Sequence, residues 1–126
     1  NNFAVPGMRI VDISDAQLAA RNPLYARFAS EPGVSTVLGD ATGASPTFFS
    51  FWLGSNDALG YAVGGGVDEA LITDRASFTA SLQSSLGAMV AGGAKGVVLT
   101  VPPMVVNTFL QSCSIQCHSH DGSGYR

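Results

Sequence analysis

The clearest hydrophobic pattern in the chain is an unbroken apolar run, TFFSFWL, at residues 47–53. Nearly every position is β-branched or aromatic, and apolar and polar residues do not alternate. Such a run is typical of a strand that is covered on both faces in a parallel α/β sheet. A second run, GVVLTV at residues 96–101, predicts another buried strand, which the two prolines after it would end.

The segment between these strands has the spacing of a helix. Its apolar positions recur at intervals of four, four, three and one and lie on one stripe: Phe78, Leu82, Leu86, Met89 and Val90. Thr73 or Asp74 is expected to begin the helix, and Gly92 and Gly93 to end it with a left-handed cap. Strand, helix and strand in this order predict a right-handed crossover unit and an α/β fold.

The remaining segments carry weaker signals. Residues 1–13 are expected to form a loop with a Pro-Gly turn, and Ser14 or Asp15 to cap a helix through residues 18–29. Pro23 would break or restart that helix. Residues 31–46 are predicted to be mostly loop around one short helical or extended turn. Residues 58–73 are predicted to be a Gly-rich excursion that turns at Gly64, Gly65 and Gly66.

Composition limits the class of protein. The chain has 126 residues, 46% of them apolar and 12% charged, which fits one globular domain or a piece of one and argues against disorder. A net charge of −3 gives no basic patch for a nucleic-acid partner. No apolar run approaches the roughly 18 residues of a membrane span. The first residue is Asn1 and no signal peptide is recognisable, so we expect that the chain does not begin at a natural start.

The candidate chemistry lies where the first strand ends. Gly54, Ser55, Asn56 and Asp57 follow Leu53 directly, and ligands of open α/β sheets bind beyond the carboxyl ends of the strands. The carboxamide of Asn56 is able to donate hydrogen bonds to a developing negative charge, as in an oxyanion hole. Gly54 would permit the tight turn that directs Asn56 into the cleft. The alternative is that Asn56 and Asp57 only form a turn, as such residues often do at strand ends.

Three separated segments carry a family resemblance. NNFAVPGMRIVDI, FFSFWLGSNDALGYA and GAKGVVLTVPP resemble, in this order, the SGNH or GDSL family of bacterial serine esterases and lipases. The similarity is to the exported lipolytic branch, which has an LG-x-ND-x-LGYA block. It covers roughly residues 1–105 and implies a three-layer α/β/α, flavodoxin-like sandwich, of which this chain holds the middle portion.

The resemblance also implies an activity and a set of site residues. The family hydrolyses carboxylic esters, here lipid or acetyl esters, through a Ser nucleophile, a His base and an Asp. The backbone N–H of Gly7 matches one oxyanion donor of the family, and the side chain of Asn56 matches another. Gly54 and Asp57 support this site, with Asp57 expected to fix the loop. The resemblance implies a small-molecule or lipid ester as substrate, export from the cytoplasm, and no metal or organic cofactor.

The catalytic blocks of the family are not found in the sequence. No Gly-Asp-Ser motif and no G-x-S-x-G elbow occurs in the 126 residues. In the family the nucleophile precedes the block that matches residues 1–9, and an Asp-x-x-His block lies near the carboxyl end. We therefore interpret the chain as a fragment with little or no activity of its own. The competing class is a non-catalytic α/β binding module.

The last 21 residues, 106–126, differ from the rest, because they lose the apolar pattern and hold both cysteines and both histidines. Cys113, Cys117, His118 and His120 are zinc-ligand types, but their spacing matches no stable tetrahedral site, and a Cys113–Cys117 disulfide is no better supported. Codons for residues 108–126, read one base forward, are able to spell LSFNPVPYNAIPMTDQDT, which resembles the family's continuation. We interpret the tail as a frame slip near residues 105–107, so that His120 is not the catalytic base. The alternative is a genuine, divergent end.

Other candidate residues are expected to be structural. We expect the four aromatic residues of the first strand to be core in preference to an acyl-chain pocket: Phe48, Phe49, Phe51 and Trp52. The glycines at 64–66 lack a dinucleotide-binding motif and are expected to lie in a loop beside the cleft. Arg9 is expected to anchor a loop. Four scattered acids are expected to serve in caps and turns: Asp12, Asp15, Asp40 and Asp68.

Overall fold

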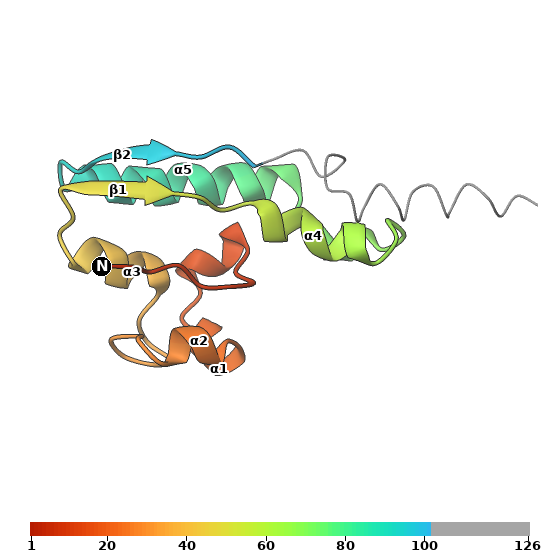
Figure 1. Cartoon of the computed structure of the whole chain (residues 1–126), viewed down its shortest axis with the longest axis horizontal. Coiled ribbons are helices and arrows are strands. Elements are labelled where there is room, and N and C mark those ends of the chain that lie inside the picture. Colours follow the sequence, from red (N-terminus) through yellow and green to blue (C-terminus); the bar gives the residue numbers. More distant parts are fainter. Residues whose placement is uncertain (102–126) are drawn as a thin grey trace, which may run out of the picture.

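The computed structural model describes residues 1–101, and Figure 1 shows how their elements are arranged. The chain begins with a 3₁₀ helix, η1 (Ile10–Ser14), followed by three short helices, α1 (Leu18–Arg21), α2 (Pro23–Ala26) and α3 (Val37–Gly43). Then come β1 (Phe48–Phe51), α4 (Ser55–Val63), a second 3₁₀ helix, η2 (Glu69–Leu71), α5 (Arg75–Ala91) and β2 (Lys95–Val98). The described residues thus form a mixed α/β protein.

The two strands pair in parallel, as the sequence predicts. Phe48 lies opposite Lys95, and Phe51 lies opposite Val98. The strand β1 is shorter than its apolar run, and β2 begins one residue before its run, at Lys95. All four residues of β2 are exposed, so the prediction that it is a buried strand is wrong for the described residues. The connection from β1 to β2 passes through α4, η2 and α5, and α5 runs alongside the sheet in Figure 1.

The long helix α5 confirms the predicted boundaries. Asp74 is its N-cap, and the Asp74 Oδ1 atom accepts a hydrogen bond from the Ser77 N–H at 3.0 Å. At the other end Gly93 has φ +82°, the left-handed conformation of a C-terminal cap. Four of the five predicted stripe residues pack inward or are buried: Phe78, Leu82, Leu86 and Met89. Val90 is exposed, so its assignment to the stripe is wrong.

The buried core lies mainly in the first third of the chain. Most of its members precede residue 38: Val5, Met8, Ile10, Ile13, Leu18, Ala19, Tyr25 and Val37, joined by Phe51 of β1. The elements η1 and α3 both pack against α5. This packing places the N-terminal segment beside the carboxyl end of β1.

The predicted helix over residues 18–29 is instead two short helices. Asn22 separates them and caps α2, because its Oδ1 accepts the Leu24 N–H at 3.0 Å, while Pro23 occupies the first position of α2. The expected cap by Ser14 or Asp15 is wrong. Ser14 ends η1, and the Oδ1 of Asp15 accepts the N–H of Gln17 in a local turn at 2.7 Å.

The expectation that β1 is covered on both faces is also wrong for the described residues. Phe51 is buried and Phe49 packs against the core, but Phe48 is 62% exposed and Trp52 is 61% exposed. Because side chains alternate along a strand, Phe49 and Phe51 lie on one face of β1, and Phe48 and Trp52 lie on the other. The core assignment therefore holds for Phe49 and Phe51 and fails for Phe48 and Trp52.

One helix lies where a loop was expected, and another lies where one short helical or extended turn was predicted. The helix α4 begins directly after the Gly54 turn and takes up residues 58–63 of the predicted Gly-rich excursion. The turn after α4 is confirmed, because Gly65 and Gly66 have φ values of +80° and +73°. The stretch 31–46 contains α3, whose N-cap Thr36 accepts the Gly39 N–H at 3.0 Å.

Candidate functional site

Gly7 lies in a tight turn near the amino terminus. The Met8 N–H donates to the Val5 carbonyl at 3.2 Å, with Pro6 and Gly7 at the two central positions and Gly7 at φ +79°. Proline followed by a residue with positive φ is the arrangement of a type II turn. The turn's own hydrogen bond uses the N–H of Met8, and no hydrogen bond within residues 1–101 uses the N–H of Gly7. Among these residues the Gly7 N–H has no partner, and Gly7 is exposed.

Gly54 connects β1 to α4 in a conformation that only glycine adopts easily. Its φ is +122°, and a Cβ atom there would lie 2.6 Å from Cγ2 of Val101 and 3.1 Å from Cζ of Phe78. Both the backbone angle and the surrounding space therefore require glycine. The turn at Gly54 places Asn56 and Asp57 in the first turn of α4, at the carboxyl end of β1.

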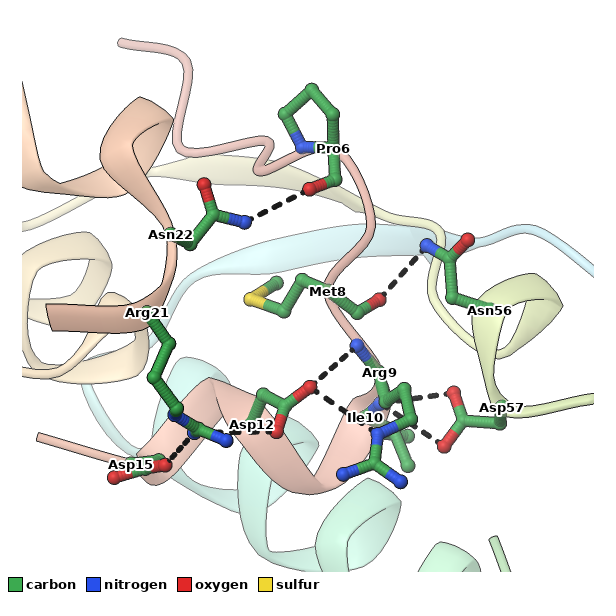
Figure 2. Close-up of polar contacts among 10 residues, drawn as sticks. All are labelled: Pro6, Met8, Arg9, Ile10, Asp12, Asp15, Arg21, Asn22, Asn56 and Asp57. Carbon is green, nitrogen blue, oxygen red and sulfur yellow. Dashed lines mark hydrogen bonds and ion pairs between the residues drawn. The ribbon is translucent and has the colours of Figure 1, made fainter. Parts of the chain in front are cut away.

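The Asn56 side chain contacts the turn that contains Gly7. Its Nδ2 atom donates to the Met8 carbonyl at 3.0 Å across a separation of 48 residues. Figure 2 shows that a second amide holds the same turn, because Asn22 Nδ2 donates to the Pro6 carbonyl, also at 3.0 Å. The structure thus brings Asn56 to Met8, the residue that follows Gly7. A carboxamide nitrogen carries two hydrogens, and the bond to Met8 uses one of those on Asn56.

Asp57 anchors the segment just beyond the turn. Its side chain is buried, and its two carboxylate oxygens accept the Ile10 N–H at 2.9 and 3.2 Å (Figure 2). A carboxylate in the first turn of a helix is also favoured by the helix dipole. Asp57 therefore ties η1 to the start of α4, in agreement with the loop-fixing role expected for it.

Arg9 belongs to a network of charges on the N-terminal segment. Asp12 accepts the Arg9 backbone N–H at 3.0 Å and lies 3.5 Å from the Arg9 Nε. Arg21 pairs with Asp12 at 3.7 Å and with Asp15 (Figure 2). Arg9 thus anchors its own loop, as expected. The side chains of Arg9 and Arg21 are 39% and 54% exposed, whereas that of Asp12 is only 12% exposed.

A second polar cluster was not predicted from the sequence. The Tyr25 hydroxyl donates to Asp40 Oδ2 at 3.0 Å, and Asp40 also accepts hydrogen bonds from Ser30 and Ser35. Burial raises the pKa of Tyr25 above its usual value of 10.0. Burial also acts to raise the pKa of Asp40, but the hydrogen bonds from Ser30, Tyr25 and Ser35 outweigh it, so that this pKa is lowered below 3.8.

The cluster joins α2 to α3 and has no link to the turn at Gly7 among the described hydrogen bonds. Its residues lie up to 15 positions apart, and no spacing in the sequence indicates that they meet. Asp40 is therefore more than the turn residue that the sequence predicts. By contrast, Asp68 caps η2 as expected, through the N–H of Ala70 at 3.0 Å.

A groove of about 810 Å³ runs along β1. Every residue from Thr47 to Leu53 lines it, and Asn56 lies among its lining residues at the end of the strand. The opposite wall comes from the N-terminal residues and α3. The side chains that line the groove carry no charge.

The described residues contain no histidine and no cysteine. The two histidines are at positions 118 and 120, outside the described range, as are Cys113 and Cys117, and so is the proposed frame slip. Within residues 1–101 no group of three or more His, Cys, Asp or Glu side chains is placed to hold a metal ion. None of the helices in this range has the length and hydropathy needed to span a membrane.

Comparison of the chain with protein-family models, with curated proteins and with solved structures finds no match. The fold and the site therefore assign the chain to a broad structural class of proteins and not to a particular family. The described residues form a mixed α/β protein in which the carboxamide of Asn56, just beyond the carboxyl end of β1, donates to the carbonyl of Met8, next to Gly7. Backbone N–H groups and carboxamides are the kinds of donor that bind an oxygen anion in oxyanion holes.

Proposed function

We propose that this chain carries the oxyanion-binding part of a carboxylic-ester hydrolase of the SGNH or GDSL type, acting on lipid or acetyl esters outside the cytoplasm. The observation that carries the proposal is the hydrogen bond from Asn56 Nδ2 to the Met8 carbonyl. It joins two of the three segments that resemble the family. In the proposed enzyme the parallel pair β1–β2 belongs to a three-layer, flavodoxin-like sandwich.

The proposed reaction is acyl transfer to water. A serine oxygen attacks the ester carbonyl carbon while histidine takes the serine proton, and the carbonyl oxygen becomes negatively charged. The Gly7 N–H and the second hydrogen of the Asn56 amide would donate to that oxygen, together with the backbone N–H of the serine. The alcohol leaves with the proton from histidine, and water then hydrolyses the acyl-serine. No metal or cofactor takes part.

The roles of the two donors differ. Asn56 is a carboxamide fixed by its bond to Met8, so little reorganisation is needed when charge develops. Loss of one such donor typically lowers kcat by about 10²–10³. The serine, histidine and aspartate of the proposed mechanism lie outside residues 1–101, and the residues described here should therefore have little activity of their own.

A non-catalytic α/β binding module is the second candidate. It is favoured by the hydrogen bonds themselves, because Asn56 to Met8 and Asp57 to Ile10 suffice to tie α4 to the N-terminal segment. In that case Asn56 is a structural residue of the strand end. The two candidates differ in whether an anion binds between Gly7 and Asn56.

An NMR titration distinguishes them. The monoanion of ethyl methylphosphonate has the tetrahedral shape and charge of the ester intermediate, and neutral ethyl acetate is the matched uncharged probe. We expect the phosphonate to shift the Gly7 amide and the Asn56 side-chain amide with one common Kd, and ethyl acetate to shift neither.

Two asparagine variants supply the control. Asn56→Ala and Asn22→Ala each remove one amide that holds the same turn, at Met8 and at Pro6 respectively. Asn56→Ala should abolish the phosphonate response of Gly7, whereas Asn22→Ala should retain it. Equal responses in the two variants, or no response in the unmodified chain, would favour the binding module.

A further inference from the structure

The peptide bond between Met8 and Arg9 is held at both of its polar groups. Its carbonyl accepts a hydrogen bond from Asn56 Nδ2 at 3.0 Å, and its N–H donates to Asp12 Oδ2, also at 3.0 Å. A trans peptide directs these two groups in opposite directions. Figure 2 accordingly shows Asn56 and Asp12 on opposite sides of the chain. One peptide unit thus connects the Asp12 carboxylate to the Asn56 carboxamide.

The two hydrogen bonds reinforce each other. The Asp12 carboxylate attracts the hydrogen of the Arg9 N–H, which makes the Met8 carbonyl oxygen of the same peptide a stronger acceptor for Asn56. Hydrogen bonds in series strengthen one another by about 10–30% per bond. A bond to an ionised carboxylate is also roughly twice as strong as a neutral one. The side chain of Asp12 is only 12% exposed, so water screens this effect less than it would at the surface.

Asn56 is the side-chain donor of the proposed oxyanion site, and its bond to Met8 uses one hydrogen of its amide. We propose that Asp12 is a positioning residue for this site, because it fixes the Asn56 carboxamide through the Met8–Arg9 peptide. The inference rests on the proposed function, in which the second hydrogen of the amide donates to the oxyanion. Asp12 itself does not touch the substrate in this mechanism.

The alternative role for Asp12 is that of a helix cap. It is the third residue of η1, and its bond to the Arg9 N–H is part of a capping box. A cap changes the stability of the fold, but it does not change how strongly Asn56 binds the Met8 carbonyl within the folded protein. Measurements on the folded state therefore separate the two roles.

Asp12→Asn and Asp15→Asn form a matched pair of variants. Each replaces a carboxylate of the N-terminal segment by a carboxamide of the same shape, and each removes one charged partner of Arg21. Asp15 accepts the N–H of Gln17 and serves as the control for charge.

The first measurement is the NMR scalar coupling across the hydrogen bond between Asn56 Nδ2 and the Met8 carbonyl carbon, in the full 126-residue chain. We expect the coupling to be about 10–30% smaller in Asp12→Asn and unchanged in Asp15→Asn. Asp12→Ala removes the acceptor altogether and should lower the coupling further. Should Asp12→Ala not fold, the asparagine pair decides, because Asp12→Asn keeps an acceptor for the Arg9 N–H.

The second measurement is the Kd of the ethyl methylphosphonate monoanion. Removal of a negative charge would by itself tighten anion binding, and would do so in both asparagine variants. Loss of positioning acts in the opposite direction. Asp12→Asn should therefore raise the Kd about threefold, which corresponds to part of the contribution of one hydrogen bond. Asp15→Asn should not raise it.

Three results would overturn the proposal. A coupling that is the same in Asp12→Asn as in the unmodified chain leaves Asp12 as a cap of η1. Equal changes of the coupling in Asp12→Asn and Asp15→Asn show an effect of charge alone. A smaller coupling with tighter phosphonate binding shows that Asp12 does not position the donor for an anion. If the unmodified chain binds no phosphonate while the coupling falls only in Asp12→Asn, the esterase proposal fails and the hold of Asp12 on Asn56 stands.

Discussion

At the carboxyl end of β1 Asp57 is 3% exposed and its carboxylate holds the backbone of Ile10, whereas within the strand Phe48 is largely open to solvent. The junction between the N-terminal segment and α4 depends on directed hydrogen bonds to backbone groups. The sheet beside it depends on apolar packing that covers one face of β1. The polar junction is thus fixed locally, while the sheet has surface left for further contacts.

The largest expected effect compares two phenylalanines of β1. Phe51→Ala removes a buried ring from the core and should lower the free energy of unfolding by about 3–5 kcal/mol. Phe48→Ala changes an exposed ring and should alter it by no more than about 0.5 kcal/mol. Urea unfolding of both variants measures the difference. Equal losses would show that the two faces of β1 are covered alike.

A second comparison tests the turn that positions Asn56. Gly54→Ala places a Cβ at φ +122° and against Val101 and Phe78, and should cost about 2–4 kcal/mol. Gly43→Ala lies in α3, where an added Cβ meets nothing within 4 Å, and should be neutral or stabilising by up to about 1 kcal/mol. Thermal unfolding of the two variants measures the difference in stability. A Gly54→Ala variant as stable as the unmodified chain would show that residue 54 does not adopt this turn.

The carboxylate of the junction gives a smaller effect. Asp57→Ala would leave the buried Ile10 N–H without its acceptor and should cost about 2 kcal/mol. Asp68→Ala removes an exposed cap of η2 and should cost at most about 1 kcal/mol. Denaturant titration of both variants is the measurement, and its m-values show whether each unfolds in one step. Equal losses in the two variants would show that the buried Asp57 carboxylate stabilises the protein no more than the exposed cap of η2 does.

The smallest effect is a pH dependence from Asp40. Its folded-state pKa is lowered below 3.8 because the hydrogen bonds from Ser30, Tyr25 and Ser35 outweigh its burial. The stability contributed by the ionised carboxylate is therefore present above pH 3.8 and is lost as the pH falls through the lower folded-state value. Asp40→Asn should reduce the loss of stability between pH 5 and pH 3. The measurement is the urea midpoint of the Asp40→Asn variant and of the unmodified chain at each pH. If both midpoints fell equally with pH, Asp40 would make no contribution to the pH dependence of stability.

Some of the fold was predictable because local signals agree with the final packing. Asp74 caps α5 and Gly93 ends it, since these residues stabilise helix ends in any context. The apolar runs located both strands, although β2 begins at Lys95, before its run. The parallel pairing followed from the helix between them.

The errors have physical causes. Glycines at 60 and 64–66 concealed α4, whose start is set by Gly54 and by the bonds of Asn56 and Asp57 to distant backbone. A continuous apolar run does not show which face of a strand is covered, so Phe48 and Trp52 were misassigned. The approach of Asn56 to the Gly7 turn followed from the family resemblance alone, since no local pattern relates residues 48 positions apart.

Sequencing the source DNA through both ends of the reading frame tests the esterase proposal most directly. We predict a segment encoding Gly-Asp-Ser upstream, and an Asp-x-x-His segment downstream in a frame shifted near residues 105–107. Flanks unrelated to both motifs, with the tail of residues 106–126 in frame, would contradict the proposal and make Asn56 a structural residue of the strand end.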